Sequence, residues 1–332
     1  MPRPLTALRA HGREVAFILK VLPMLPSGIV DRLTRTPVVE TVRYPSRDGE
    51  ITADLYRPAG RGRHPGIVLC LGVVPFGVDH PQIPRLCDAL ARSGFVTLIH
   101  WSDAMRDLRL VPEDADDIAR AFAWLVGRDD VDAARSGLFG TCVGGTFAFL
   151  AASRALIRDQ VHFVGAFAPF SSMWTFARDI ASATRDDRDA TRPWEVDQLT
   201  RSVFRRTVES FLSPGEARPL LEAQDRHAAD AALRGLPVGA RERLDAMSPI
   251  VHLSEIRAPW ITFGHDRDDT VIPVGESWRL AQALTGRPGV RYTEYGMFQH
   301  ADPTKRHLSS LALAREVLRF YRSLHPLFRQ TA

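Results

Sequence analysis

The sequence predicts an α/β protein in which a mostly parallel sheet is covered by helices on both faces. Largely apolar runs, the pattern of buried parallel strands, recur at 66–71, 95–99, 137–140, 161–167 and 260–263, and a further strand is expected at 290–295. Stretches with helical apolar spacing alternate with these runs, and such alternation is typical of parallel α/β sheets. A hairpin ahead of the first run is expected to add antiparallel strands at one edge.

The individual elements follow from local signals. Residues 41–44 and 51–56 flank an Asp48-Gly49 turn, and this pattern predicts the hairpin. Helices with one apolar face are expected between Pro81 and Gly94 and at 112–126, 146–155, 276–284 and 307–324.

Composition narrows the class of protein. The chain has 332 residues, of which 45% are hydrophobic and 25% charged, so it is expected to be globular. Its formal charge of +4 comes from arginines that alternate with aspartates. Since no compact basic stripe is present, we expect no nucleic-acid partner. The three cysteines, Cys70, Cys87 and Cys142, are too dispersed for a disulfide framework or a zinc site, which favours a reducing cytoplasm.

Residues 1–36 are predicted to form an N-terminal helical arm. Three arginines precede an apolar stretch at 15–25, which Lys20 and Pro23 interrupt. The stretch is too short to span a membrane, and a signal peptide is the weaker alternative. We expect an amphipathic helix that packs on the domain or on a partner, with no integral membrane span. The oligomeric state stays open.

The core is predicted to come in two parts, 37–170 and 257–332, separated by an inserted segment, residues 171–256. This segment is rich in Asp, Arg and aromatic residues and has no strand-like run. Because it follows one parallel strand and precedes the next, it is expected to form a helical cap above the carboxyl edge of the sheet. A decorative surface insertion is the alternative.

A nucleophile elbow is predicted where the run Leu138-Phe139 ends in Gly140-Thr141-Cys142-Val143-Gly144-Gly145. Such a strand-turn-helix is so sharp that the residues around the nucleophile must be very small. Gly140, two residues before Cys142, and Gly144 and Gly145, two and three residues after it, are small enough. The sequence therefore places a thiol where most elbows carry a serine, and an inert buried thiol is the alternative.

The base and the acid of a catalytic triad are expected downstream, in the chain order nucleophile, acid, base. Asp269 lies in an Asp-x-Val-x-Pro loop after the strand 260–263 and is the favoured acid, with Asp266 and Asp268 as alternatives. His300 is the histidine of the loop after the next strand, so it is the predicted base.

The remaining site residues follow from the same layout. The N–H groups of Val143 and of Val73 or Val74 are expected to form the oxyanion hole. His100 and Trp101 end a strand at this edge and are candidates for lining a substrate pocket, with packing as the alternative; Trp174 is the candidate from the cap. The His and Asp residues near 265–269 lack metal-motif spacing, so we expect neither a metal nor a cofactor in this site.

Over about residues 37–325 the chain resembles the α/β-hydrolase superfamily, and its Cys elbow is similar to that of the dienelactone hydrolases. The matching pieces are residues 140–145, the Asp269 loop, His300 and Phe76-Gly77-Val78-Asp79. The resemblance implies the α/β-hydrolase fold and cleavage of a lactone or ester through an acyl-thioester on Cys142. The hairpin and the inserted segment look more like larger peptidase- or esterase-type members.

The predicted function is therefore hydrolysis of a small-molecule carboxylic ester, lactone or thioester by a Cys-His-Asp triad. An acyl-CoA thioesterase or an acyltransferase would use the same cysteine on another substrate or acceptor. A non-catalytic ligand-binding protein on this fold is the third hypothesis, and the presence of all three triad residues argues against it.

Overall fold

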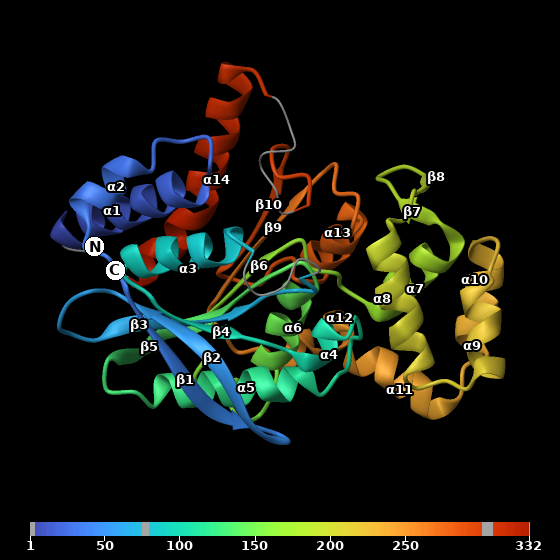
Figure 1. The fold of residues 1–332 in the computed structure, drawn as a ribbon. Coiled ribbons are helices and arrows are strands. Elements are labelled where there is room, and N and C mark those ends of the chain that lie inside the picture. The colour runs from blue at the N-terminus through green and yellow to red at the C-terminus, as the bar shows by residue number, and fades with distance from the viewer. Residues whose placement is uncertain (1–3, 75–79, 301–307, 332) are drawn as a thin grey trace.

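The computed structural model describes residues 4–74, 80–300 and 308–331. In this part of the chain, eight strands form one sheet in the order β1-β2-β4-β3-β5-β6-β9-β10 (Figure 1). The strands are β1 (Val38–Ser46), β2 (Gly49–Arg57), β3 (His64–Cys70), β4 (Val96–His100), β5 (Val131–Thr141), β6 (Phe163–Phe167), β9 (Trp260–Asp266) and β10 (Val290–Tyr295).

The sheet is parallel except at one edge. β1 and β2 form the predicted hairpin, and β2 runs antiparallel to β4, with Leu55 opposite Leu98. From β4 to β10 every neighbouring pair is parallel. The predicted fold class, a mostly parallel sheet with an antiparallel edge, is therefore confirmed.

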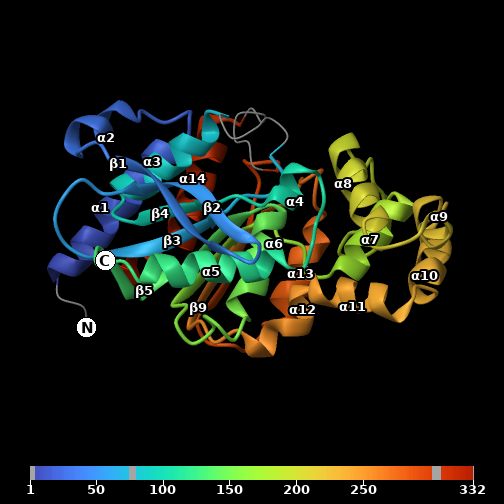
Figure 2. The same ribbon diagram turned by 60° about the horizontal axis from the view of Figure 1, so that its bottom comes forward.

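Alternate strand residues pack against two layers of helices. In β3, Val68 belongs to the apolar cluster of α5 (Asp114–Val126) and α6 (Val143–Ala152). Its neighbour Ile67 belongs to a second cluster, together with residues of α1, α3 and α14. Figures 1 and 2 show these two layers on opposite faces of the sheet. The bounds of the other helices of the core are α1 (Pro4–Val21), α2 (Gly28–Leu33), α3 (Gln82–Arg92), α4 (Asp103–Arg106), α13 (Val274–Ala283) and α14 (Ser310–Thr331).

The first helix, α1, lies against the last, α14 (Figure 1). The ring of Phe17 packs between those of Phe320 and Phe328, with centroids 6.3 and 5.9 Å away. The guanidinium of Arg13 donates hydrogen bonds to the carbonyl oxygens of Thr331, at 2.6 Å, and Gly94, at 3.2 Å. The two ends of the chain thus share one packed seam.

Helices make up most of the inserted segment, which lies at one end of the molecule in Figures 1 and 2. The expectation of no strand is wrong, because β7 and β8 pair as an antiparallel hairpin. These strands are three residues long and partly or fully exposed, so they leave no apolar run in the sequence. The elements are α7 (Met173–Ser182), β7 (Thr184–Asp186), β8 (Thr191–Pro193), α8 (Gln198–Glu209), α9 (Pro214–Leu221), α10 (Arg226–Arg234), α11 (Val238–Ala246), α12 (Pro249–His252) and a 3₁₀ turn (Leu253–Glu255).

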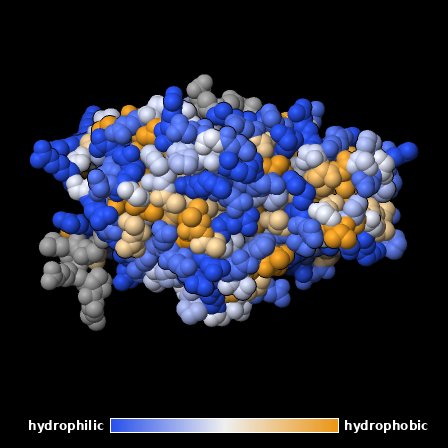
Figure 3. Space-filling model, turned by 90° about the horizontal axis from the view of Figure 1, so that it is seen from below, coloured by the Kyte–Doolittle hydropathy of each residue, from blue (hydrophilic) through white to orange (hydrophobic). Residues whose placement is uncertain are grey.

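The next features are the surface of the molecule and the state of its three cysteines. Figure 3 shows one face on which apolar residues lie in small groups among hydrophilic ones. No helix in the described ranges is long and apolar enough to cross a membrane. All three cysteines are free; Cys70 and Cys87 are buried, whereas Cys142 is partly exposed.

Candidate functional site

Cys142 lies in a strained turn between the end of β5 and the start of α6. Its backbone has φ 56° and ψ −138°, a region that residues with a side chain rarely adopt. The N–H of Cys142 donates to the carbonyl of Phe167 at 2.8 Å, and the N–H of Gly145 donates to the carbonyl of Cys142 at 2.9 Å. These bonds hold the turn, and with it the thiol, at the carboxyl edge of the sheet.

The glycines around Cys142 are needed for close approach of the backbone. A Cβ on Gly140 would lie 2.3 Å from the carbonyl oxygen of Gly144, and one on Gly144 would lie 2.2 Å from that of Cys70. Gly145 is less constrained, since its Cβ would lie 3.1 Å from the Cβ of Ala166 and 3.2 Å from the carbonyl oxygen of Gly140. The strand-turn-helix geometry of an elbow therefore depends most on Gly140 and Gly144.

The structure brings His300 and Asp269 together from the loops after β10 and β9. Nδ1 of His300 lies 2.8 Å from Oδ2 of Asp269 and 3.1 Å from Oδ1. The carboxylate is fully buried and accepts further hydrogen bonds from the N–H groups of Val271, at 2.8 Å, and Ile272, at 3.0 Å. Burial alone would raise the pKa of Asp269, but the facing His300 and His265 hold that pKa below its usual range. Asp269 is thus a fixed anion beside His300.

His300 also faces the thiol of Cys142, which acts on the pKa of its ring. Burial favours a lower pKa for His300, but Asp269 and Cys142 together raise its pKa well above the usual value. Thiol, imidazole and carboxylate therefore lie in series, with the imidazole in the middle and hydrogen-bonded to the carboxylate. Such a series can move a proton between sulfur and nitrogen while the carboxylate orients the ring.

The two other aspartates of the loop have different positions. Oδ2 of Asp266 accepts a hydrogen bond from the N–H of Phe298 at 2.7 Å, and Oδ1 accepts one from the N–H of Asp268 at 3.0 Å. Asp266 therefore ties the loop after β9 to the loop that carries His300. The side chain that meets His300 is that of Asp269, the favoured candidate.

His265 is a residue of this site that the sequence analysis weighed only as a metal ligand. It is fully buried at the end of β9, and its Nε2 lies 3.3 Å from Oδ2 of Asp269 and 2.9 Å from the carbonyl oxygen of Ile272. Its Nδ1 lies 2.7 Å from the hydroxyl of Ser277. The carbonyl requires a proton on Nε2, so Nε2–H points toward both oxygens. Only its position just before the Asp269 loop could have signalled this role.

The loop after β3 passes directly over Cys142. A Cβ on Gly72 would lie 2.9 Å from the Cβ of Cys142 and 3.3 Å from its sulfur. Val73 and Val74 follow at once, and Val143, as first residue of α6, has an N–H with no acceptor inside the helix. The candidate oxyanion donors therefore come from segments on either side of the thiol. The motif at 76–79 lies outside the described residues.

The three candidate pocket residues have other partners. Nδ1 of buried His100 lies 2.9 Å from the hydroxyl of Tyr44. The indole of Trp174 donates to Asp245 at 2.7 Å. Trp101 lines a surface cavity of about 300 Å³ with residues of β2 and α3, which does not include Cys142. These contacts favour packing roles for His100 and Trp174.

The inserted segment touches the loop that carries Asp269. Arg185 in β7 donates to the carbonyl of Asp269 at 3.3 Å, and the indole of Trp194 donates to the carbonyl of Thr270 at 3.0 Å. Glu276 of α13, fully buried, accepts from the N–H and hydroxyl of Ser171, at 2.9 and 2.6 Å. The segment is therefore attached to the core beside the candidate acid.

Comparison with known proteins gives sequence matches to parts of three curated proteins, whereas no family model matches the chain. An uncharacterized 31.7 kDa protein of Escherichia coli is 34% identical over 104 residues, which are 29% of this chain and 35% of that protein. A Bradyrhizobium protein described as a probable 2-oxo-3-(5-oxofuran-2-ylidene)propanoate lactonase is 31% identical over 147 residues, 40% of this chain and 58% of that one. The chain thus spans between a third and three fifths of these relatives' lengths.

Solved structures match over most of the chain. An acylaminoacyl peptidase of Pyrococcus horikoshii has a TM-score of 0.60 at 16% identity, over 91% of this chain and 44% of that one. A 2,6-dihydroxy-pseudo-oxynicotine hydrolase has a TM-score of 0.58 at 14% identity, and the match covers 88% of this chain and 68% of that one. DcsB, solved in complex with its substrate analogue, has a TM-score of 0.57 at 15% identity, and the match covers 89% of this chain and 100% of that one. The chain has the α/β-hydrolase fold, as the sequence predicted.

Proposed function

We propose that this chain is a hydrolase that cleaves carboxylic ester, lactone or thioester bonds through Cys142. His300 serves as the general base and Asp269 as the acid that orients it. The observation that carries the proposal is the hydrogen bond between buried Asp269 and His300, with the thiol of Cys142 facing His300 from its strained turn. A nucleophile, a base and an orienting acid in this geometry are what acyl transfer requires.

Acylation begins when His300 takes the proton of the thiol. The sulfur of Cys142 then attacks the acyl carbon, and the carbonyl electron pair moves to the oxygen. The N–H groups of Val143 and of Val73 or Val74 are the expected donors to that oxyanion, since Val143 follows the thiol at the start of α6 and Gly72, next to Val73, lies against it. When the C–O bond breaks, His300 gives its proton to the leaving oxygen, and the acyl group stays on sulfur as a thioester.

Deacylation repeats these steps with water. His300 takes a proton from water, the hydroxide attacks the thioester carbon, and the C–S bond breaks with return of the proton to sulfur. With a lactone, the leaving alcohol remains attached to the acyl chain, so one hydroxy acid is the product. Throughout, the carboxylate of Asp269 stabilises the imidazolium that forms.

A lactone or another small acyl compound is the favoured substrate class. One partial relative is described as a probable lactonase, and it is matched over 147 residues. Because the inserted segment contacts the Asp269 loop through Arg185 and Trp194, we expect it to act as a cap that limits the size of the acyl group.

Intact-mass analysis after exposure to p-nitrophenyl acetate tests the nucleophile. Wild type should acquire a single acetyl group and release nitrophenol repeatedly, whereas Cys142→Ala should do neither. Cys87→Ala is the matched control, since this thiol is fully buried and its loss should leave acylation unchanged. Equal turnover by wild type and Cys142→Ala would show that the proposal is wrong.

A second experiment tests which molecule accepts the acyl group from Cys142. A panel of esters, lactones and acyl-CoA compounds, assayed with and without hydroxylamine, compares water with an amine as acceptor of the acyl group. Hydrolysis as the main reaction supports the proposal. Transfer that outruns hydrolysis at low amine concentration would instead identify an acyltransferase that uses the same thiol.

A further inference from the structure

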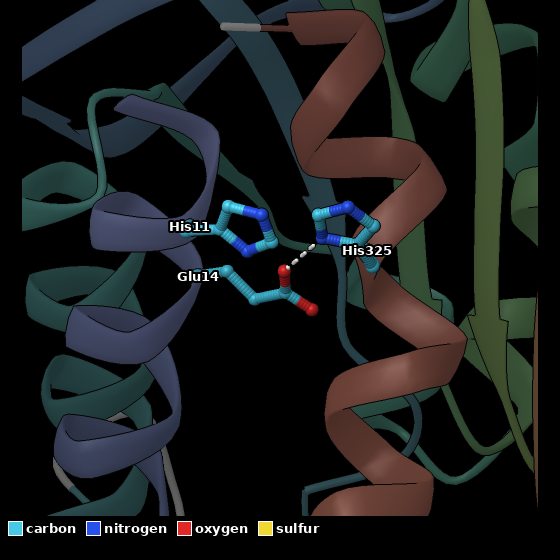
Figure 4. Close-up of side chains that lie close together, drawn as sticks. All are labelled: His11, Glu14 and His325. Atoms are coloured by element: carbon cyan, nitrogen blue, oxygen red, sulfur yellow. Dashed lines mark hydrogen bonds and ion pairs between the residues drawn. The ribbon is translucent and has the colours of Figure 1, made fainter. Parts of the chain in front are cut away.

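Three side chains at the seam between α1 and α14 form a group that suits a metal ion. His11 and Glu14 lie one turn apart on α1 and His325 lies on α14, and each offers one ligand atom (Figure 4). These atoms lie within 4.8 Å of one another. Nδ1 of His325 is 2.7 Å from Oε2 of Glu14.

Glu14 provides an independent reason to look for a ligand. Its side chain has no solvent exposure, and its second oxygen, Oε1, accepts no hydrogen bond from any residue within the described ranges. A buried polar atom without a partner is costly, and a bound ion or water is one way in which native proteins satisfy such an atom. A cation between Glu14 and the two imidazoles would remove that cost.

The two histidines are placed to share such a cation. Their rings stack with centroids 4.5 Å apart and planes inclined by 18°. His11 is exposed, which gives an ion access from solvent and lets the ring turn toward it. The hydroxyl of Tyr321 hydrogen-bonds Nδ1 of His11, so it lies beside the same space and becomes an outer partner when the ring turns.

We propose that His11, Glu14 and His325 bind one divalent transition-metal cation of the Zn²⁺ class. Two imidazole nitrogens and a carboxylate oxygen suit Zn²⁺, with ligand distances of about 2.0–2.2 Å and water in the remaining position. The site joins two helices whose ligands are 311 residues apart in the chain, so binding closes a very long loop. Its role is to clamp α1 onto α14, separately from the thiol chemistry at Cys142.

Calorimetric titration with ZnCl₂ tests this site on the full chain after chelator treatment. Because the thiol of Cys142 and the imidazole of His300 could also bind zinc, the titration is repeated in a Cys142→Ser background. We expect one Zn²⁺ per chain in both proteins and a thermal midpoint that rises by a few degrees with the metal. Zinc uptake that disappears with Cys142→Ser would overturn the proposal.

Ligand variants locate the binding. His11→Gln and His325→Gln should each weaken zinc affinity by at least about tenfold and abolish the thermal shift. His227→Gln, an exposed histidine of α10, is the matched control and should bind like the parent. Glu14→Gln tests the buried ligand, with circular dichroism to check that the chain is folded. If both His→Gln variants bind zinc like the parent, or the folded Glu14→Gln does, the site is not where we place it.

Discussion

Nε2 of His265 lies 3.3 Å from Oδ2 of Asp269, the same oxygen that Nδ1 of His300 approaches at 2.8 Å. The carboxylate is thus held by two imidazoles, one from the end of β9 and one from the loop after β10. Ser277 and the carbonyl of Ile272 fix the ring of His265 in turn. This arrangement orients Asp269 before any substrate binds, and it leads to the first two predictions.

Asp269→Asn should lower the rate of Cys142 acylation by on the order of a thousandfold or more, while the chain stays folded. An amide at this position can favour the wrong tautomer of the imidazole and cannot stabilise the imidazolium. Asp268→Asn is the matched control, because Asp268 is an exposed residue of the same loop, and it should acylate like wild type. Stopped-flow measurement of nitrophenol release compares the two. A larger loss in Asp268→Asn would assign the acid elsewhere.

His265→Gln should slow acylation about tenfold and lower the free energy of unfolding by about 1–3 kcal/mol, because buried hydrogen-bond partners are lost. His265 is a positioning residue, so it should act through Asp269. If it does, adding His265→Gln to Asp269→Asn should cause little further loss of rate. Additive losses in this double-mutant cycle would show that His265 acts only on stability.

Gly144→Ala should destabilise the protein by about 3 kcal/mol or more, since the new Cβ would lie 2.2 Å from the carbonyl oxygen of Cys70. On Gly145 the new Cβ would lie 3.1 Å from the Cβ of Ala166 and 3.2 Å from the carbonyl oxygen of Gly140, so Gly145→Ala should cost about 1 kcal/mol. Urea unfolding of the pair measures the difference. Equal costs would mean that the turn relaxes to accept a side chain at Gly144.

The inner strands of the sheet could be predicted from the sequence because β3, β4, β6 and β9 are mostly buried and appear as apolar runs. Chain order alone admits Asp266, Asp268 and Asp269 as the partner of His300, and the Asp-x-Val-x-Pro pattern favours Asp269 without excluding the other two. The loop geometry separates them, since Asp266 accepts hydrogen bonds from the N–H groups of Phe298 and Asp268 while Asp269 meets His300.

Two other features of the structure could not be predicted from patterns in the sequence. β7 and β8 are too short and too exposed to leave a period-two signal. The cluster of His11, Glu14 and His325 brings together the two ends of the chain, so its spacing resembles no local metal motif. Both depend on tertiary packing that local spacing does not encode.

The attachment of the inserted segment should weaken in acid through Asp186. This carboxylate of β7 forms ion pairs with Arg178, Arg226 and Arg279, the last of which belongs to α13 of the core. Burial alone would raise the pKa of Asp186, but the arginines lower it to about 2, against about 3.9 in an unfolded chain. Its stabilising contribution is therefore complete above about pH 4 and is lost as the pH falls toward 2.

Thermal unfolding followed from pH 5 to pH 2 checks this dependence. Asp186→Asn should be less stable than wild type at pH 5, and the gap should narrow as the pH falls toward 2, because the wild-type carboxylate becomes protonated there. Asp187→Asn is the matched control: this neighbour pairs with Arg192 of β8, within the segment itself, so its loss should leave the attachment to the core unchanged. A constant gap for Asp186→Asn over this range would mean that the three arginines do not depend on the charge of Asp186 to hold the segment on α13.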